Sequence, residues 1–225
     1  RQNERLESFV SVVSHDLRNP LTVLTGALEL AERTGDPEHF ERGKRARDRM
    51  EQLIEDLLTF ARQGESVEDP TPVDVAEVAE ASWDAVATAG ATLEVHADLE
   101  LRCHEGRFRE LLENLFRNAV EHGSTSPPSQ APEDAVEHGG EQVSVTVGEL
   151  PDHEGFYVAD DGPGIPPERR SEVFESGVST SDDGTGFGLS IVDQIATAHD
   201  WEITVTESDA GGARFEVRTG GVSVS

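Results

Sequence analysis

Apolar residues in the first 63 positions recur every three or four residues, which is the spacing of an amphipathic helix. One stripe predicts a helix from about Glu4 to Arg33, and a second predicts a helix from about Pro37 to Gln63. The segment 34–37 (TGDP) carries residues that end one helix and begin another. Pro20 lacks a backbone donor inside the first helix, so we expect a kink there.

Two helices of this kind cannot enclose both apolar stripes by themselves. The stripes consist of Leu6, Val10, Val13, Leu17, Leu21, Leu24 and Leu28 in the first helix, and of Ala46, Met50, Leu53, Leu57 and Phe60 or Ala61 in the second. We therefore expect an antiparallel hairpin that forms a four-helix bundle with a second copy, which makes the protein a homodimer. Because Arg1 already falls inside the helical pattern, we expect the chain to be the C-terminal part of a longer protein.

Residues 73–220 alternate between strand and helix patterns, which predicts helices packed on a mixed sheet. The expected helices are Asp74–Ala87, Glu105–His122, Glu168–Phe174 and Phe187–His199, and the expected strands are Thr92–Asp98, Glu100–Cys103, Gln142–Leu150, Phe156–Ala159, Trp201–Glu207 and Ala213–Arg218. The inner face expected for the second of these helices consists of Phe108, Leu111, Leu112, Leu115, Phe116 and Ala119.

The pattern thus predicts an α+β protein with two domains. The helical hairpin occupies 1–63, a linker with Gly, Ser and Pro occupies 64–72, and the α/β domain occupies 73–220. The stretch 124–141 is rich in Ser, Pro, Gly and acidic residues, so we expect it to be a surface loop inserted in the second domain.

Charge narrows the range of partners. The chain has 18 Lys and Arg against 46 Asp and Glu, a net charge of −28. This excess excludes sequence-independent binding to nucleic acid and direct contact with anionic membranes, both of which need a positive surface. No apolar run approaches the ~18 residues that span a bilayer. We expect a cytoplasmic location, with any membrane tether in a region preceding Arg1.

The acidity is uneven: residues 1–63 have a net charge of −2, and residues 64–225 one of −26. There is a single lysine, Lys44, against 17 arginines. Lysine-poor, acid-rich proteins resemble those of halophiles, where ~1 M salt shortens the screening length to about 3 Å. The alternative is an ordinary acidic protein.

Four separated motifs carry the candidate chemistry. They are Phe9–Leu21 (FVSVVSHDLRNPL), Asn114–His122 (NLFRNAVEH), Asp160–Pro166 (DDGPGIP), and Gly184–Leu189 (GTGFGL) with Phe174 before it. Together, in this order, they closely resemble the H, N, G1, F and G2 boxes of sensor histidine kinases of two-component systems.

That resemblance implies a dimerisation and phosphoacceptor hairpin followed by a GHKL (Bergerat) ATP-binding α/β sandwich. It also implies an ATP-dependent protein-histidine kinase. Such an enzyme phosphorylates its own histidine and passes the group to an aspartate of a response regulator receiver domain. ATP and Mg²⁺ are the implied substrate and metal.

His15 is the candidate phosphoacceptor. It lies beside the apolar stripe, and a neutral imidazole nitrogen is a nucleophile at physiological pH. A solvated surface histidine is the alternative. By resemblance, His15 receives the phosphoryl group, the adjacent Asp16 is its acidic partner, and Asn19 serves water-mediated dephosphorylation.

Asn114 and Asn118 lie four residues apart, on one face of a helix, and an amide oxygen can bind a hard cation. By resemblance, Asn118 binds Mg²⁺ and Asn114 supports the phosphates; the alternative is an exposed polar face. Arg117 is our candidate phosphate contact, since a polyanion needs local positive charge in this acidic domain. Glu121 departs from the family, which often has a lysine there.

Asp160 ends a predicted strand, and by resemblance its carboxylate accepts a hydrogen bond from the exocyclic amine of adenine. Gly162 and Gly164 permit close approach of the backbone to the base. The alternative is an Asp-capped turn. The glycines of the segment 184–188 precede and enter a predicted helix, and backbone N–H groups at a helix start favour phosphate. Residues 175–183, between Phe174 and these glycines, would form an ATP lid. The remaining members of the predicted ATP site are Ile165, Phe174, Thr180, Gly184, Thr185, Gly186, Phe187, Gly188 and Leu189.

Two other functions compete with the kinase. A GHKL ATPase of the chaperone or mismatch-repair kind would lack the motif around His15, and a silent scaffold would not need Asn118 and Asp160. A basic cluster remains open to two interpretations, an exposed face with i,i+4 ion pairs or a docking surface for an acidic partner. The cluster consists of Arg42, Lys44, Arg45, Arg47 and Arg49.

Overall fold

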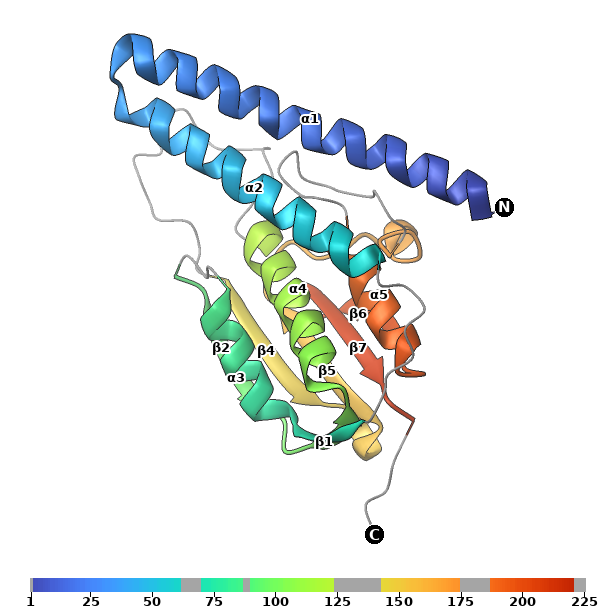
Figure 1. Cartoon of the computed structure of the whole chain (residues 1–225). Helices are drawn as coiled ribbons and strands as arrows, with labels where there is room; N and C mark the ends of the chain where they lie inside the picture. The colour runs from blue at the N-terminus through green and yellow to red at the C-terminus, as the bar shows by residue number, and fades with distance from the viewer. Residues whose placement is uncertain (1, 62–69, 87–89, 124–142, 175–186, 221–225) are drawn as a thin grey trace. The chain divides into compact units, whose positions relative to one another are not determined.

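The computed structural model describes residues 2–61, 70–86, 90–123, 143–174 and 187–220, and for residues 2–16, 52, 55–61 and 152 it describes the backbone alone. The chain divides into two compact units, a helical hairpin and an α/β unit (Figure 1). No helix in these described ranges combines the length and apolar character needed to cross a bilayer.

The hairpin consists of α1 (Gln2–Thr34) and α2 (Pro37–Ala61), which run antiparallel in Figure 1. Gly35 ends α1 in a left-handed conformation with φ 69°, and its N–H donates to the carbonyl of Ala31 at 2.8 Å. Asp36 caps α2 by accepting from the N–H of Glu38 at 3.0 Å. Both predicted helices are confirmed, and α1 continues through Pro20.

Small residues line the contact between the two helices. Ala27, Ala31 and Ala46 are buried, and a Cβ on Gly43 would lie 3.8 Å from the Cβ of Ala27. The larger residues of the first predicted stripe are placed differently: Leu21 is 53% exposed and Leu28 is 47% exposed in the single chain. The hairpin therefore leaves part of its apolar stripe uncovered.

The α/β unit contains helices on a mixed sheet, as predicted. Its strands are β1 (Thr71–Asp74), β2 (Thr92–His96), β3 (Glu100–Cys103), β4 (Ser144–Glu149), β5 (Gly155–Asp160), β6 (Glu202–Glu207) and β7 (Ala213–Arg218). Its helices are α3 (Val75–Ala85), α4 (Glu105–Gly123) and α5 (Gly188–Ala198), with short 3₁₀ turns η1 (Pro151–His153) and η2 (Pro167–Arg169).

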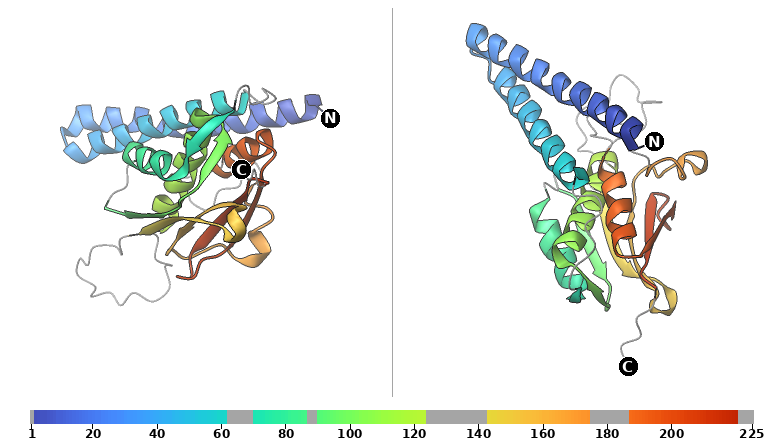
Figure 2. Two further views of the ribbon diagram at one scale, coloured as in Figure 1. Left: turned by 90° about the horizontal axis from the view of Figure 1, so that it is seen from below. Right: turned by 45° about the vertical axis from the view of Figure 1, so that its right-hand side comes forward.

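Five strands form the main sheet in the order β2-β4-β5-β7-β6. Only β2 and β4 are parallel, and the other neighbours are antiparallel. The three helices α3, α4 and α5 lie on one side of this sheet (Figure 2). β1 and β3 form a separate two-stranded antiparallel sheet.

The core lies between the helices and the main sheet. All six residues predicted for the inner face of α4 are buried, because a 3.6-residue period places them toward the sheet. Phe108 of α4 meets Phe156 of β5 edge-to-face at 5.3 Å, and Trp201 closes the group at 6.1 Å from Phe108. This packing fixes α4 against the strand that ends at Asp160.

Two expectations are corrected. Thr71 and Pro72, predicted in the linker, belong to β1, which a four-residue pattern containing proline could not reveal. The helix predicted over 168–174 is wrong, because only η2 forms and turns follow it. There, tertiary contacts hold the chain instead: Phe174 packs edge-to-face on Phe215 at 6.4 Å.

Candidate functional site

Asn114 and Asn118 lie on the same face of α4, against the first residue of α5. Asn114 is buried, and its Nδ2 donates to the carbonyl of Glu110 at 2.9 Å. A Cβ on Gly188 would lie 3.3 Å from Oδ1 of Asn114 and 3.6 Å from Nδ2 of Asn118. A Cβ at 188 would therefore press on the amide oxygen of Asn114 and come into van der Waals contact with the amide of Asn118.

Asn118 has an unsatisfied donor. Its Nδ2 is buried and has no hydrogen-bond partner within the described part of the chain. Such a group costs roughly 1–3 kcal/mol unless a ligand supplies an acceptor. Phosphate oxygens would satisfy it, and the amide oxygen of the same side chain suits a hard cation. The residues present therefore fit a magnesium–phosphate group.

Asp160 is the last residue of β5, and its two carboxylate oxygens differ. Oδ1 accepts from the N–H of Gly162 at 2.9 Å and from the N–H of Ala213 at 3.1 Å. Oδ2 has no hydrogen-bond partner among the residues described. Burial raises the pKa of Asp160, and the two backbone donors offset part of that rise. The fold thus holds one carboxylate oxygen with two backbone donors, and the described residues offer no donor to the other.

The loop after Asp160 lies against two other backbone segments. A Cβ on Gly162 would lie 2.7 Å from the Cα of Gly123, at the end of α4. Gly164 has φ 70°, and its Cβ would lie 2.9 Å from the carbonyl oxygen of Gly211. Both positions need glycine because backbone atoms of this chain lie close to them, and the predicted approach of this loop to the base stays a prediction.

A scan against protein-family models gives two matches. Residues 103–220 match the histidine kinase-, DNA gyrase B- and HSP90-like ATPase family, and residues 5–66 match the His Kinase A (phospho-acceptor) domain. The chain belongs to this ATPase family. The phosphoacceptor domain precedes the ATPase domain in the same chain.

Curated relatives agree with that assignment. The probable sensor histidine kinase TcrY of Mycobacterium tuberculosis is 33% identical over 231 residues, covering 95% of this chain and 45% of TcrY. The histidine-protein kinase/phosphatase MprB of Mycolicibacterium smegmatis is 32% identical, covering 93% of this chain and 44% of MprB. The chain therefore spans less than half the length of these relatives.

Solved structures share the fold. A mycobacterial sensor histidine kinase MprB superposes with a TM-score of 0.52 at 25% identity, over 65% of this chain and 95% of that one. The Acinetobacter baumannii histidine kinase AdeS gives a TM-score of 0.62 over 92% of this chain and 97% of its own, and at 20% identity it supports the fold alone.

The other predicted residues of this histidine kinase-like chain are placed as follows. Gly188 and Leu189 begin α5, Phe187 before them is buried, and Arg117 is half-buried with no ion-pair partner among the described residues. Ile165 lies in the loop after β5. Thr180, Gly184, Thr185 and Gly186 lie outside the described residues.

The predicted phosphoacceptor region lies in the hairpin. The backbone of His15 and Asp16 is part of α1, while their side chains lie outside the described part. Asn19, one helical turn after His15, is exposed. Their roles stay predictions.

The sequence analysis did not identify two residues that lie near the site. His122 follows Asn118 by four residues on α4; burial lowers its pKa, which the charge of Asp160 partly offsets. That i,i+4 spacing could have revealed it. Arg170 donates from Nε to the carbonyl of Ile165 at 2.9 Å, a contact with no signal in the sequence.

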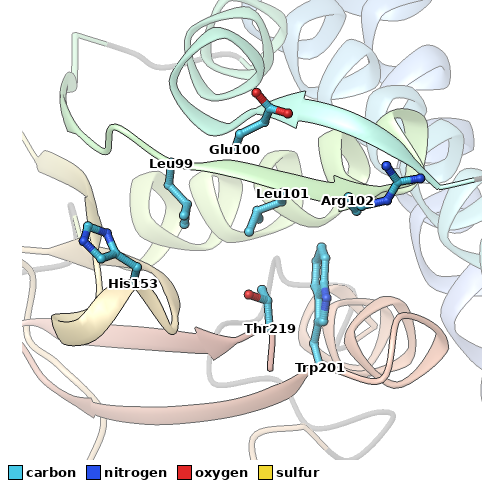
Figure 3. A pocket seen from close by; sticks show the side chains of 7 residues that line it. All are labelled: Leu99, Glu100, Leu101, Arg102, His153, Trp201 and Thr219. Atoms are coloured by element: carbon cyan, nitrogen blue, oxygen red, sulfur yellow. The ribbon is translucent and has the colours of Figure 1, made fainter. Parts of the chain in front are cut away.

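A separate small cavity of about 40 Å³ is lined by residues 99–102, His153, Trp201 and Thr219 (Figure 3). Its volume suits a few water molecules. None of the predicted site residues lines it. The nucleotide hypothesis therefore rests on the asparagines and Asp160.

Proposed function

We propose that the chain is the core of an ATP-dependent protein-histidine kinase. It would phosphorylate His15 and pass the phosphoryl group to an aspartate of a response regulator. The observation that carries the proposal is the pair Asn114 and Asn118, with one buried unsatisfied amide, against the glycine that begins α5. Family membership, with a phosphoacceptor domain in the same chain, supports it.

ATP would be held at two places. Asp160 offers Oδ2 to the exocyclic amine of adenine, while Gly162, Gly164 and Ile165 line the base. The asparagine pair and Arg117 face the phosphates, together with the N-terminus of α5. Magnesium, when bound through Asn118, would neutralise phosphate charge. A related kinase, ShkA, 25% identical with a TM-score of 0.57 over 97% of this chain and 47% of its own, was solved with the ATP analogue AMPPNP.

The residues that complete the phosphate site belong to the glycine-rich segment and its surroundings. We propose that this segment follows the triphosphate with its backbone N–H groups, as the sequence predicts. These residues are Phe174, Thr180, Gly184, Thr185, Gly186, Phe187, Gly188 and Leu189.

The chemical step transfers the terminal phosphoryl group. A neutral nitrogen of His15 attacks the γ-phosphorus, an N–P bond forms, and the bond from that phosphorus to the β–γ bridging oxygen breaks, so that ADP leaves. Asp16 holds the other ring nitrogen and accepts its proton as the imidazole gains the phosphoryl group. Asn19 would position the water that removes the group again.

We propose that the active form is a homodimer. The exposed Leu21 and Leu28 of α1 and the 49% exposed Ile54 of α2 supply apolar surface for a second copy, as in a four-helix bundle. The partner proposed for phosphotransfer is a response regulator. The kinase ThkA, with a TM-score of 0.67 and 19% identity over 96% of this chain and 63% of that one, was solved in complex with response regulator protein TrrA.

Incubation with γ-labelled ATP tests the function. We expect acid-labile, base-stable label on the protein, lost in His15→Gln and kept in the control His39→Gln, which changes a histidine on α2. Both variants should still bind ATP. ADP release without labelled protein would favour an ATPase of the chaperone or mismatch-repair kind, and neither product would favour a scaffold.

A further inference from the structure

Ser208 occupies the turn between β6 and β7 and is buried, 7% exposed. Its hydroxyl donates to the main-chain carbonyl of Asp160 at 2.6 Å. The hydroxyl oxygen of Ser208 also accepts a hydrogen bond from the N–H of Gly212 at 2.9 Å. One side chain thus joins the end of β5 to a turn 48 residues away in sequence.

Ser208 bonds to this carbonyl because of the way in which the β5–β7 ladder ends. The last pair is Ala159 with Arg214, and Asp160 lies one residue beyond it. There the N–H of Ala213 donates to the carboxylate Oδ1 of Asp160 rather than to its main-chain carbonyl. The part-buried carbonyl accepts from the Ser208 hydroxyl instead. The serine therefore frees a backbone donor to hold the carboxylate.

We propose that Ser208 is a positioning residue that aims the carboxylate of Asp160 at the base of the nucleotide. The proposal rests on the role of Asp160 in reading adenine given above. With Oδ1 held by Gly162 and Ala213, the carboxylate cannot rotate freely, and Oδ2 keeps one direction toward a donor.

Removing the hydroxyl would break this arrangement. The carbonyl of Asp160 would lose its donor, and a part-buried carbonyl without a donor is costly. The N–H of Ala213 lies opposite Asp160 in the register of the ladder, and its move to the carbonyl would release Oδ1. Close packing limits other relief, since a Cβ on Gly212 would lie within 2.2 Å of the same carbonyl oxygen.

The test compares ATP with purine riboside triphosphate, whose base lacks the 6-amino group. We expect the wild type to bind ATP about tenfold or more tightly than the analogue, as one hydrogen bond to a charged acceptor supplies. Ser208→Ala should lose most of that preference while keeping its affinity for the analogue. Asp160→Ala should do the same, and Ser208→Thr, which keeps the hydroxyl, should restore the preference.

Ser82→Ala is the matched control. Ser82 is fully buried on α3, and its hydroxyl has no hydrogen-bond partner among the described residues. Loss of that hydroxyl should leave both affinities unchanged. Equal weakening of ATP and analogue in Ser208→Ala would overturn the positioning role, because a purely structural defect would affect both. A wild type without any preference would overturn adenine reading by Asp160, and with it this proposal.

Discussion

At the residue scale, the candidate phosphate site beside Asn114 and Asn118 needs a residue without a side chain at position 188. Gly188 is the first residue of α5 and lies against Asn114 and Asn118. Its φ is not in the left-handed region, so the backbone itself would accept alanine. What glycine supplies at this position is space above the two amides rather than conformational freedom. Substitution here should therefore affect binding more than stability.

Gly188→Ala should weaken ATP binding several-fold, because the new methyl group narrows the space beside the asparagine amides. The preference of about 1 kcal/mol for alanine over glycine applies to helix interiors, and at this first helical position the 3.3 Å contact with Asn114 opposes it, so thermal stability should stay close to that of the wild type. Fluorescent ATP-analogue titration and thermal melts measure the two effects. Gly26→Ala is the control, since a Cβ there meets nothing within 4 Å. Unchanged affinity in Gly188→Ala would mean that the nucleotide does not use this space.

At the element scale, η2 and the residues after it hold the loop that follows β5. Arg170 donates from Nε to the carbonyl of Ile165 and places Nη2 3.7 Å from Glu207 of β6. The Glu207 side chain is 68% exposed, so that ion pair contributes little, and the hydrogen bond carries more of the effect. The Arg170 side chain thus holds the loop, although the helix predicted over 168–174 does not form.

Arg170→Ala should loosen the loop that carries Gly162 and Gly164 and weaken ATP binding by about three- to tenfold, as loss of a hydrogen bond worth ~1 kcal/mol implies. Hydrogen exchange of residues 161–166 should accelerate. Arg169→Ala serves as control, because the Arg169 side chain has no hydrogen-bond or ion-pair partner among the described residues. Equal exchange and affinity in both variants would exclude a tethering role for Arg170.

At the scale of the whole molecule, charge separates the two units. Residues 64–225 hold 34 acidic and 8 basic residues. Several of those bases already have partners: Arg109 pairs with Glu105 at 3.1 Å, and Arg214 pairs with Glu216 at 2.9 Å and lies over the ring of Tyr157. Most acidic residues of this unit therefore lack a basic partner, and only dissolved salt can screen their mutual repulsion. We propose that the protein is adapted to high salt.

The α/β unit should melt at higher temperature as KCl rises from 0.1 to 3 M, with most of the gain below ~1 M, where the screening length falls to about 3 Å. Trp83 and Trp201 both lie in this unit, so tryptophan fluorescence reports its unfolding. Helical circular dichroism follows the helices of both units, so the part of its transition that tryptophan fluorescence does not share reports the hairpin, and this part should respond weakly to salt. A flat or falling melting temperature would leave only an unusually acidic kinase-family protein.

The sequence by itself determined the elements and much of the family chemistry. Periodicity reports which face of a helix or strand is buried, and this is why the hairpin helices, β3, β7 and the inner face of α4 were predicted correctly. The motifs placed Asn114 and Asn118 on one face of a helix and Asp160 at the end of a strand, where the structure has them. Their roles stay predictions until nucleotide binding is measured.

Only the tertiary structure decided how distant segments meet. β1 exists because it pairs with β3, and no four-residue pattern predicts such a partner. Asp160 is held by Ala213 and its carbonyl by Ser208, contacts that span 53 and 48 residues. The physical reason is that local pattern sets which face of an element is apolar, whereas the packing of the whole sheet sets which backbone donors remain for a particular carboxylate.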